Sequence, residues 1–271
     1  MRRTSRTKSS GILLLFALFL LLPAGCAERE DQKTIRIAEQ FGLAYAPVQI
    51  MRIKKLIEAQ DPSITVEWVQ LENTAAIREA VIAGEVDAGF GGIPPFLTGW
   101  DAGMDWKIAT GLSRAPIGLV TNRDAIRSLA DFGPDDAIVV PQPGSIQHIL
   151  LSMALDRRFG DAGYLDTNLV SMSHPNGMQA LMNDSTIAAH FTSPPYIFLE
   201  LDQPGFRQVL SGEEAFGGDF TFIVGSVTRN LHDERADLYE AFIHAVEAAV
   251  KFIRDNPDET ASLLADLYGI P

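Results

Sequence analysis

Short apolar runs alternate with amphipathic segments along most of the chain. Apolar or alternating runs predict strands at 34–38, 64–69, 86–90, 107–110, 117–121, 137–140, 168–172, 187–191, 207–210 and 220–227. Apolar residues at helical spacing predict helices at 47–57, 75–83, 178–182 and 237–254, and further helices that begin at Pro94-Pro95 and after Gly144-Ser145. This alternation favours an α/β fold with mostly parallel sheets.

One motif occurs twice, about a hundred residues apart. Phe90-Gly91-Gly92-Ile93-Pro94-Pro95-Phe96-Leu97 and Phe191-Thr192-Ser193-Pro194-Pro195-Tyr196-Ile197 each follow an apolar run and lead into a predicted helix with a proline pair in its first turn. The repeat indicates two lobes built on one plan, with a ligand cleft at the C-terminal ends of their strands. Two unrelated helices that begin at proline are the alternative, because the spacing from Phe to Pro differs by one residue.

The order of the elements predicts that the chain passes from a first lobe to a second lobe and back. We expect lobe 1 at 34–116 and 217–271 and lobe 2 at 117–216, with 220–227 as the return strand. The two crossings, near 113–118 and 211–225, are the candidate hinge.

The N-terminus resembles a bacterial lipoprotein signal. Four positive side chains within residues 1–8 precede the apolar run 12–22, which is too short to span a bilayer. Ala24 and Gly25 then precede Cys26, although Pro23 stands where a leucine is usual. We expect a signal peptide at 1–25, a lipidated Cys26 and a tether at 26–33, with a plain secretory signal as the alternative. The protein would be periplasmic or on the cell surface, anchored to the membrane only through this lipid.

Charge and cysteine content exclude several classes of protein. The net charge is −13, and removal of residues 1–25, which carry four positive and no negative side chains, would change it to −17. Such an acidic domain is a poor candidate for binding nucleic acid or an anionic membrane surface. Cys26 is the only cysteine, so the mature domain has no disulfide, internal thiol nucleophile or cysteine-based metal site.

The usual catalytic patterns are missing from the sequence. The five histidines show no paired metal spacing, Ser145 is not part of a nucleophile elbow, and no phosphate-binding Gly-Lys-Ser/Thr motif occurs. We therefore expect a protein that is not an enzyme, with no catalytic residues, no metal and no cofactor.

Several short stretches occur in a characteristic order: 76–80, 83–89, Pro94-Pro95, Gly144-Ser145 before Leu150-Leu151, 193–196 and 255–257. With the lipoprotein start, they resemble bacterial ABC-transporter substrate-binding proteins of the nitrate/sulfonate/taurine type, a family that also includes carriers of thiamine-related pyrimidines. The resemblance covers nearly the whole mature chain. It implies a type II periplasmic-binding-protein-like fold, in which two α/β lobes close on a small molecule, and delivery of that molecule to an ABC permease and its ATPase. We expect a monomer. From the resemblance we would also expect several tens of further residues after Pro271.

The ligand of such a fold sits at strand ends, where helix N-termini present unpaired N–H groups. Ser145 is the best candidate, together with Gln147 or His148, and a simple helix cap is the alternative. Pro94 and Pro95 remove two donors from the first lobe. The candidate binding residues are Gln40, Phe41, Tyr45, Gly92, Ile93, Ser113, Ser145, Gln147, His148, His174, Thr192, Ser193 and Tyr196.

We therefore expect the extracytoplasmic solute-binding component of an ABC importer. Phe41 and Tyr45 favour an organic ligand with an apolar part, such as a sulfonate or a pyrimidine-type compound, over nitrate. Two alternatives use the same fold: an enzyme similar to the fungal pyrimidine synthase, whose Cys-rich motif this chain lacks, and a ligand-sensing module.

Overall fold

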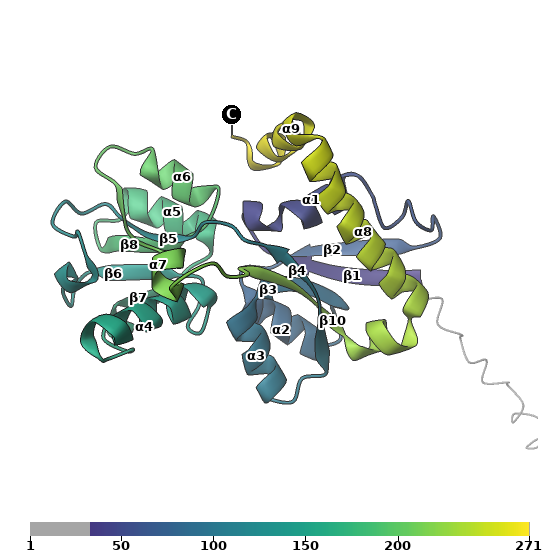
Figure 1. The fold of residues 1–271 in the computed structure, drawn as a ribbon, viewed down its shortest axis with the longest axis horizontal. Helices are drawn as coiled ribbons and strands as arrows, with labels where there is room; N and C mark the ends of the chain where they lie inside the picture. The colour runs from purple at the N-terminus through teal and green to yellow at the C-terminus, as the bar shows by residue number, and fades with distance from the viewer. Residues whose placement is uncertain (1–32, 271) are drawn as a thin grey trace, which may run out of the picture. The chain divides into compact units, whose positions relative to one another are not determined.

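The computed structural model describes residues 33–270 of the protein. These residues form two five-stranded sheets, with the strand orders β2-β1-β3-β10-β4 and β7-β6-β8-β5-β9 (Figure 1). The predicted signal peptide, the lipidation site Cys26 and the tether up to residue 32 lie outside the described residues.

The first sheet contains β1 (Thr34–Glu39), β2 (Thr65–Gln70), β3 (Ala88–Gly92), β4 (Trp106–Ser113) and β10 (Ile223–Thr228). β1 is parallel to β2 and β3, whereas β10 is antiparallel to β3 and β4. Four of the five strands therefore point the same way, as the prediction of a mostly parallel sheet requires, and β10 alone runs against them. The reason is the route of the chain, which leaves the sheet at Ser113 and re-enters opposite it at Ile223, so that β10 runs against β4.

The second sheet contains β5 (Gly118–Thr121), β6 (Ala137–Val140), β7 (Leu169–Ser171), β8 (Ile187–Thr192) and β9 (Arg207–Ser211). β6 is parallel to β7 and β8, and β5 is antiparallel to β8 and β9. The chain enters this sheet at Gly118 and leaves it at Ser211, and these two residues are paired. Both sheets thus combine a parallel βαβ part with antiparallel strands next to the crossings.

Helices cover both faces of each sheet (Figure 1). The first sheet carries α1 (Ala46–Ile53), α8 (Ala236–Asp255) and α9 (Pro257–Tyr268) on one face, and α2 (Thr74–Ile82) and α3 (Ile93–Asp101) on the other. The second sheet carries α5 (His174–Asn183) and α6 (Tyr196–Leu201) on one face, and α4 (Ile146–Phe159) and α7 (Gly212–Phe216) on the other. No helix within residues 33–270 is both long and apolar enough to cross a membrane.

Several helix boundaries differ from the prediction. α1 ends four residues early, before Lys55, which has a positive φ of 52° and therefore interrupts the helix. α5 begins at His174, four residues earlier than predicted, because Ser173 is its N-cap residue and Pro175 occupies its first turn. The proline pair lies within the first turn of α3 but just before α6. The short α7 and the last helix, α9, were not predicted.

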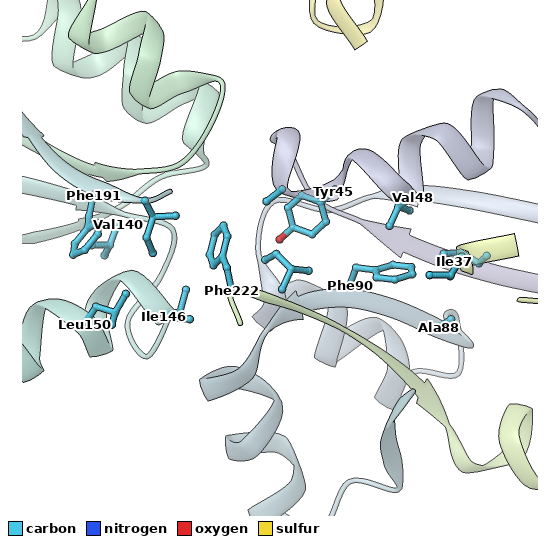
Figure 2. Packing of buried hydrophobic residues seen from close by; sticks show 14 of the residues in the cluster. Ile37, Tyr45, Val48, Ala88, Phe90, Val140, Ile146, Leu150, Phe191 and Phe222 are labelled. Atoms are coloured by element: carbon cyan, nitrogen blue, oxygen red, sulfur yellow. The ribbon is translucent and has the colours of Figure 1, made fainter. Parts of the chain in front are cut away.

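Apolar packing is continuous from one sheet to the other. Ile37 and Phe90 are fully buried in the first sheet, and Val140 and Phe191 are fully buried in the second, and all four belong to one hydrophobic cluster. Phe222, in the second crossing, is buried in the same cluster and lies between the two groups in Figure 2. The two sheets therefore meet across apolar side chains as well as across the polar site described next.

Candidate ligand-binding site

A cavity lies where the strand ends of the two sheets meet. The residues that line it are Gln40, Tyr45, Thr74, Gly92, Pro95, Pro141, Gln142, Ser145, Ile146, Gln147, His174, Ser193, Phe222 and Ile223. Its volume of about 20 Å³ is about the room that a single water molecule requires. A larger molecule can enter only if the walls separate.

The wall from the first sheet is held by hydrogen bonds around Gln40, which follows β1. Nε2 of Gln40 donates to Oγ1 of Thr74 at 3.0 Å and to the carbonyl of Phe90 at 2.9 Å. Gly92 N–H also donates to Oγ1 of Thr74, at 3.3 Å. Both amide hydrogens of Gln40 are therefore used within the protein, and only its carbonyl oxygen can face a ligand.

The wall from the second sheet contains the N-terminus of α4. Ser145 is the N-cap residue, and its hydroxyl accepts a hydrogen bond from the N–H of His148 at 3.3 Å. The hydroxyl keeps its own hydrogen, and Ile146 and Gln147 are the first residues of the helix, so their N–H groups have no partner within it. Gly144 precedes the cap with a φ of +76°, a conformation that favours glycine. This corner of the cavity offers several donors and the positive end of a helix dipole.

His148 points away from the cavity. Its Nδ1 accepts from Gly144 N–H at 2.8 Å, and its Nε2 lies 3.1 Å from Oδ1 of Asp166. Both ring nitrogens are used by the loop before α4 and by the turn that carries Asp166. The prediction that Ser145 caps the helix is confirmed, whereas His148 is not in the cavity wall.

Gln147 begins a chain of four buried polar side chains that leads from the cavity into the second sheet. Nε2 of Gln147 lies 3.1 Å from Nε2 of His174, Nδ1 of His174 lies 3.1 Å from Nε2 of His190, and Nδ1 of His190 lies 2.6 Å from Oε1 of Glu200. Burial lowers the pKa of both imidazoles, that of His190 to about 3, and raises the pKa of Glu200 to about 9. All three groups therefore favour their neutral forms.

Two hydrogen bonds join the sheets beside the cavity. Oε1 of Gln142, from the second sheet, accepts from Ala75 N–H in α2 at 3.0 Å. The carbonyl of Pro194 accepts from Leu43 N–H at 2.8 Å. Opening the cavity must break or lengthen such bonds, so they are part of the energy difference between open and closed forms.

Seven of the thirteen predicted binding residues line the cavity: Gln40, Tyr45, Gly92, Ser145, Gln147, His174 and Ser193. Phe41 and Tyr196 instead line a separate groove of about 490 Å³, together with Arg52, Met178 and Tyr268. Ile93, Ser113, His148 and Thr192 line neither. Thr192 is fully buried in β8, paired with Gly118, and Ser113 ends β4 with its carbonyl bonded to Phe222 N–H.

The prediction missed seven lining residues: Thr74, Pro95, Pro141, Gln142, Ile146, Phe222 and Ile223. Gln142 lies in the strand-end loop that contains Gly144, so its position in the sequence could have identified it as a binding candidate.

Within the described chain, the residues that line the cavity include no Lys, Arg, Asp or Glu, and no group of three or more His, Cys, Asp or Glu side chains could hold a metal ion. Any ligand charge must therefore be met by neutral dipoles.

The chain matches a family model described as the NMT1-like family over residues 28–268. It is 26% identical to a candidate aliphatic sulfonates-binding protein of Bacillus subtilis (strain 168), over 95% of this chain and 78% of that protein.

Two solved structures are similar in fold. One is the alkanesulfonate-binding protein SsuA from Xanthomonas axonopodis pv. citri bound to MOPS, with a TM-score of 0.75 and 21% identity over 88% of this chain and 80% of that one. The other is the periplasmic nitrate-binding protein NrtA from Synechocystis PCC 6803, with a TM-score of 0.72 and 13% identity over 88% of this chain and 68% of that one. At these identities the structural likeness concerns the fold: two mixed α/β sheets in the arrangement of periplasmic binding proteins.

Proposed function

Because the chain belongs to the NMT1-like family, we propose that it is the solute-binding component of an ABC importer and that it binds a small organic oxyanion, with an aliphatic sulfonate as the first candidate. The sulfonate-binding description of the Bacillus subtilis relative supports this ligand class. The resemblance to substrate-binding proteins supports transfer of the ligand to a permease and its ATPase.

The observation that carries the proposal is the cavity between the two sheets. Ser145 and the first N–H groups of α4 supply donors on one side, which suits the oxygens of an anion at a helix N-terminus. Pro95, Ile146 and Phe222 supply apolar surface around the same cavity, which suits an alkyl group. A sulfonate joined to a short alkyl chain offers both kinds of surface.

We propose the predicted lobe boundaries for the moving parts: 34–116 with 217–271, and 117–216. Each of the two sheets belongs to one of these parts. The connections after Ser113 and after Ser211 are the candidate hinge, because they are the only two places within residues 33–270 where the chain passes between the sheets. Hinge closure around a ligand is a common mode of domain motion.

We further propose that Cys26 is lipidated and is the sole membrane anchor, as the signal-like N-terminus indicates. A Cys26→Ser variant should lose incorporation of labelled fatty acid and move to the soluble extracytoplasmic fraction, because an acidic domain has little affinity for an anionic membrane. Retention of the label would contradict this part of the proposal.

Calorimetric titration of the purified mature protein tests the ligand class. Ethanesulfonate, butanesulfonate, nitrate and a substituted aminopyrimidine are titrated at pH 7, and we expect saturable binding of the two sulfonates. Binding of only nitrate or only the pyrimidine would replace the ligand class but keep the solute-binding role. Turnover of a bound compound, followed by mass spectrometry, would instead favour the enzymatic alternative.

A further inference from the structure

The chain of polar side chains behind the cavity is longer than ligand contact requires. Gln147 and His174 line the cavity, but His190 and Glu200 are fully buried behind them in β8 and α6. The three contacts, at 3.1, 3.1 and 2.6 Å, use both ring nitrogens of both histidines. Each neutral imidazole has one donor and one acceptor, so the direction of one hydrogen bond fixes the direction of the others.

Two directions satisfy every member of the chain. The reference state is an ionised Glu200 carboxylate beside a neutral His190. If this pair holds one additional proton, His190 donates from Nε2 to Nδ1 of His174, and His174 donates from Nε2 to Gln147. If that proton is absent, Nδ1 of His190 donates to the Glu200 carboxylate, His174 donates from Nδ1 to His190, and Gln147 donates to His174. The first direction requires Oε1 of Gln147 at His174, and the second requires its Nε2 there, which is how the structure places the amide. A half-turn of the amide about its bond to Cγ exchanges the oxygen and the nitrogen, so either direction is open to this side chain.

We propose that His174, His190 and Glu200 are positioning residues that set which end of the Gln147 amide faces the ligand, so that the cavity accepts an oxyanion while the Glu200–His190 pair holds its proton. In that state the NH₂ group of Gln147 is directed into the cavity as a donor. Loss of the proton turns the carbonyl oxygen toward the ligand and adds a buried negative charge. Both changes oppose an anion. This inference rests on the proposed binding of an oxyanion.

The direction does not depend on which member of the pair carries the proton. A protonated Glu200 donates to Nδ1 of His190, which leaves the hydrogen of His190 on Nε2. A protonated His190 beside a carboxylate carries hydrogens on both nitrogens, and its Nε2 still donates to His174. In both cases His174 donates to Gln147, and the amide presents the same face to the cavity.

The surroundings of the chain contain few competing charges. The neighbouring strands β5 and β6 carry no ionisable side chain. In α4, the ring of His148, next to Gln147, is bonded to Gly144 and Asp166. The ring of Tyr196 in α6 lies against His174 with a centroid distance of 6.0 Å. Burial raises the pKa of Tyr196, so it stays neutral. Burial, with no neighbouring charge, raises the pKa of Glu200 to about 9. The extra proton is therefore present at pH 7 and is lost in the alkaline range.

Titration of ethanesulfonate against pH tests the coupling to ligand. A sulfonate stays ionised throughout, so any pH dependence belongs to the protein. For the wild-type protein we expect constant affinity from pH 7 to 8.5 and a loss approaching tenfold per pH unit above about 9. In the Glu200→Gln variant the new amide cannot lose a proton, and it can either donate to His190 or accept from it. We therefore expect this variant to bind ethanesulfonate a few times more weakly at pH 7 and to lose no affinity in the alkaline range. Glu240→Gln, at an exposed position in α8, should follow the wild-type curve.

Nitrogen NMR of the histidine rings tests the chain without any ligand. In the wild-type protein we expect His174 to carry its hydrogen on Nε2 at pH 7 and on Nδ1 above pH 10. A hydrogen on Nδ1 of His174 at pH 7, or no exchange of its tautomer over this range, would overturn the inference, as would an alkaline loss of affinity that persists in Glu200→Gln.

The two proposals fail in different ways. Ethanesulfonate binding without a tautomer change would leave the proposed function and remove the positioning role. A tautomer change without sulfonate binding would show that the hydrogen bonds from Gln147 to Glu200 reverse their direction but that the proposed oxyanion is wrong. That result would overturn the inference that these residues select the ligand.

Discussion

Glu200 is a carboxyl group with no exposed surface and an imidazole 2.6 Å away. Its pKa is raised to about 9 in the folded protein because burial disfavours the charged form. A raised carboxyl pKa means that the folded state binds more protons than the unfolded state. The contribution of this group to stability is therefore fully present at acid pH and is lost as the pH rises from the unfolded value, near 4.5, to about 9.

We predict that the free energy of unfolding of the wild-type protein falls relative to that of Glu200→Gln by about 1.4 kcal/mol per pH unit between pH 6.5 and 9. His190 does not obscure this window, because its lowered pKa of about 3 confines its effect to pH values below its unfolded value of 6.5. Urea denaturation of both proteins at several pH values measures the difference. Parallel stability curves would show that Glu200 is ionised in the folded protein.

Ser145 gives a second prediction at this scale. Ser145→Ala removes the cap of α4, at a cost of about 1 kcal/mol in stability, and one donor toward the ligand. Loss of that hydrogen bond should weaken ethanesulfonate binding about fivefold. Ser128→Ala is a matched control, because Ser128 is an exposed residue that caps a single helical turn away from the cavity lining. It should lower stability without changing the dissociation constant. Equal ligand affinity in Ser145→Ala and the wild type would show that Ser145 caps the helix and does not contact the ligand.

Single residues were predictable from sequence where the signal was local. Ser145 stands between a strand and an amphipathic helix, so its capping role follows from nearest neighbours. Nothing local in the sequence predicts the contact between His174 and His190. The two residues are 16 positions apart, on α5 and β8, and they meet only because α5 packs against the second sheet. Their burial with Glu200 could not be inferred from spacing.

At the scale of elements, α5 packs against β8 through a glycine. A Cβ atom built on Gly177 would lie 2.8 Å from Nε2 of His190 and 2.9 Å from Cγ1 of Val139. Both neighbours are fully buried and belong to strands of the second sheet, so they have little freedom to move. The glycine is therefore required by close packing and not by its φ.

We predict that Gly177→Ala lowers stability by about 1–2 kcal/mol, because the cost of overpacking exceeds the gain in helix propensity. Gly111→Ala is the control, since a Cβ atom there meets only Cγ2 of Thr221, at an ordinary 3.8 Å, and it should be nearly neutral. Thermal or urea unfolding measures both variants. A stabilised Gly177→Ala protein would show that α5 can shift away from the sheet.

Most strands could be predicted from apolar runs, and most helices from periodicity with a proline or serine at the start. The reversed direction of one strand in each sheet could not, because it depends on where the chain re-enters the sheet. β5 and β10 follow the two crossings and are antiparallel to their neighbours for that reason. α7 has only five residues, too few for a periodic signal, and α9 directly follows α8 after a break at Asn256.

At the scale of the whole described chain, the cavity is too small for the proposed ligand. A volume of about 20 Å³ accepts about one water molecule, so exchange of a sulfonate requires the sheets to separate at the two crossings. Free protein should therefore sample forms more open than this structure, and the bound form should be compact.

We predict that saturating ethanesulfonate lowers the radius of gyration measured by small-angle scattering. It should also raise the free energy of unfolding by about 2.7 kcal/mol at a ligand concentration 100 times the dissociation constant. Sodium chloride at equal ionic strength is the control. An unchanged radius with confirmed binding would argue against a hinge and would leave the fold unaffected.

The position of β10 also has a consequence for the order in which the protein is completed. β10 lies between β3 and β4 in the first sheet, yet it follows every strand of the second sheet in the chain. During synthesis from the N-terminus, all strands of the second sheet are therefore available before β3 and β4 can be joined. Domains generally fold as units as they emerge. The second sheet can assemble while the first still has a gap between β3 and β4, and only the arrival of residues 223–228 closes it.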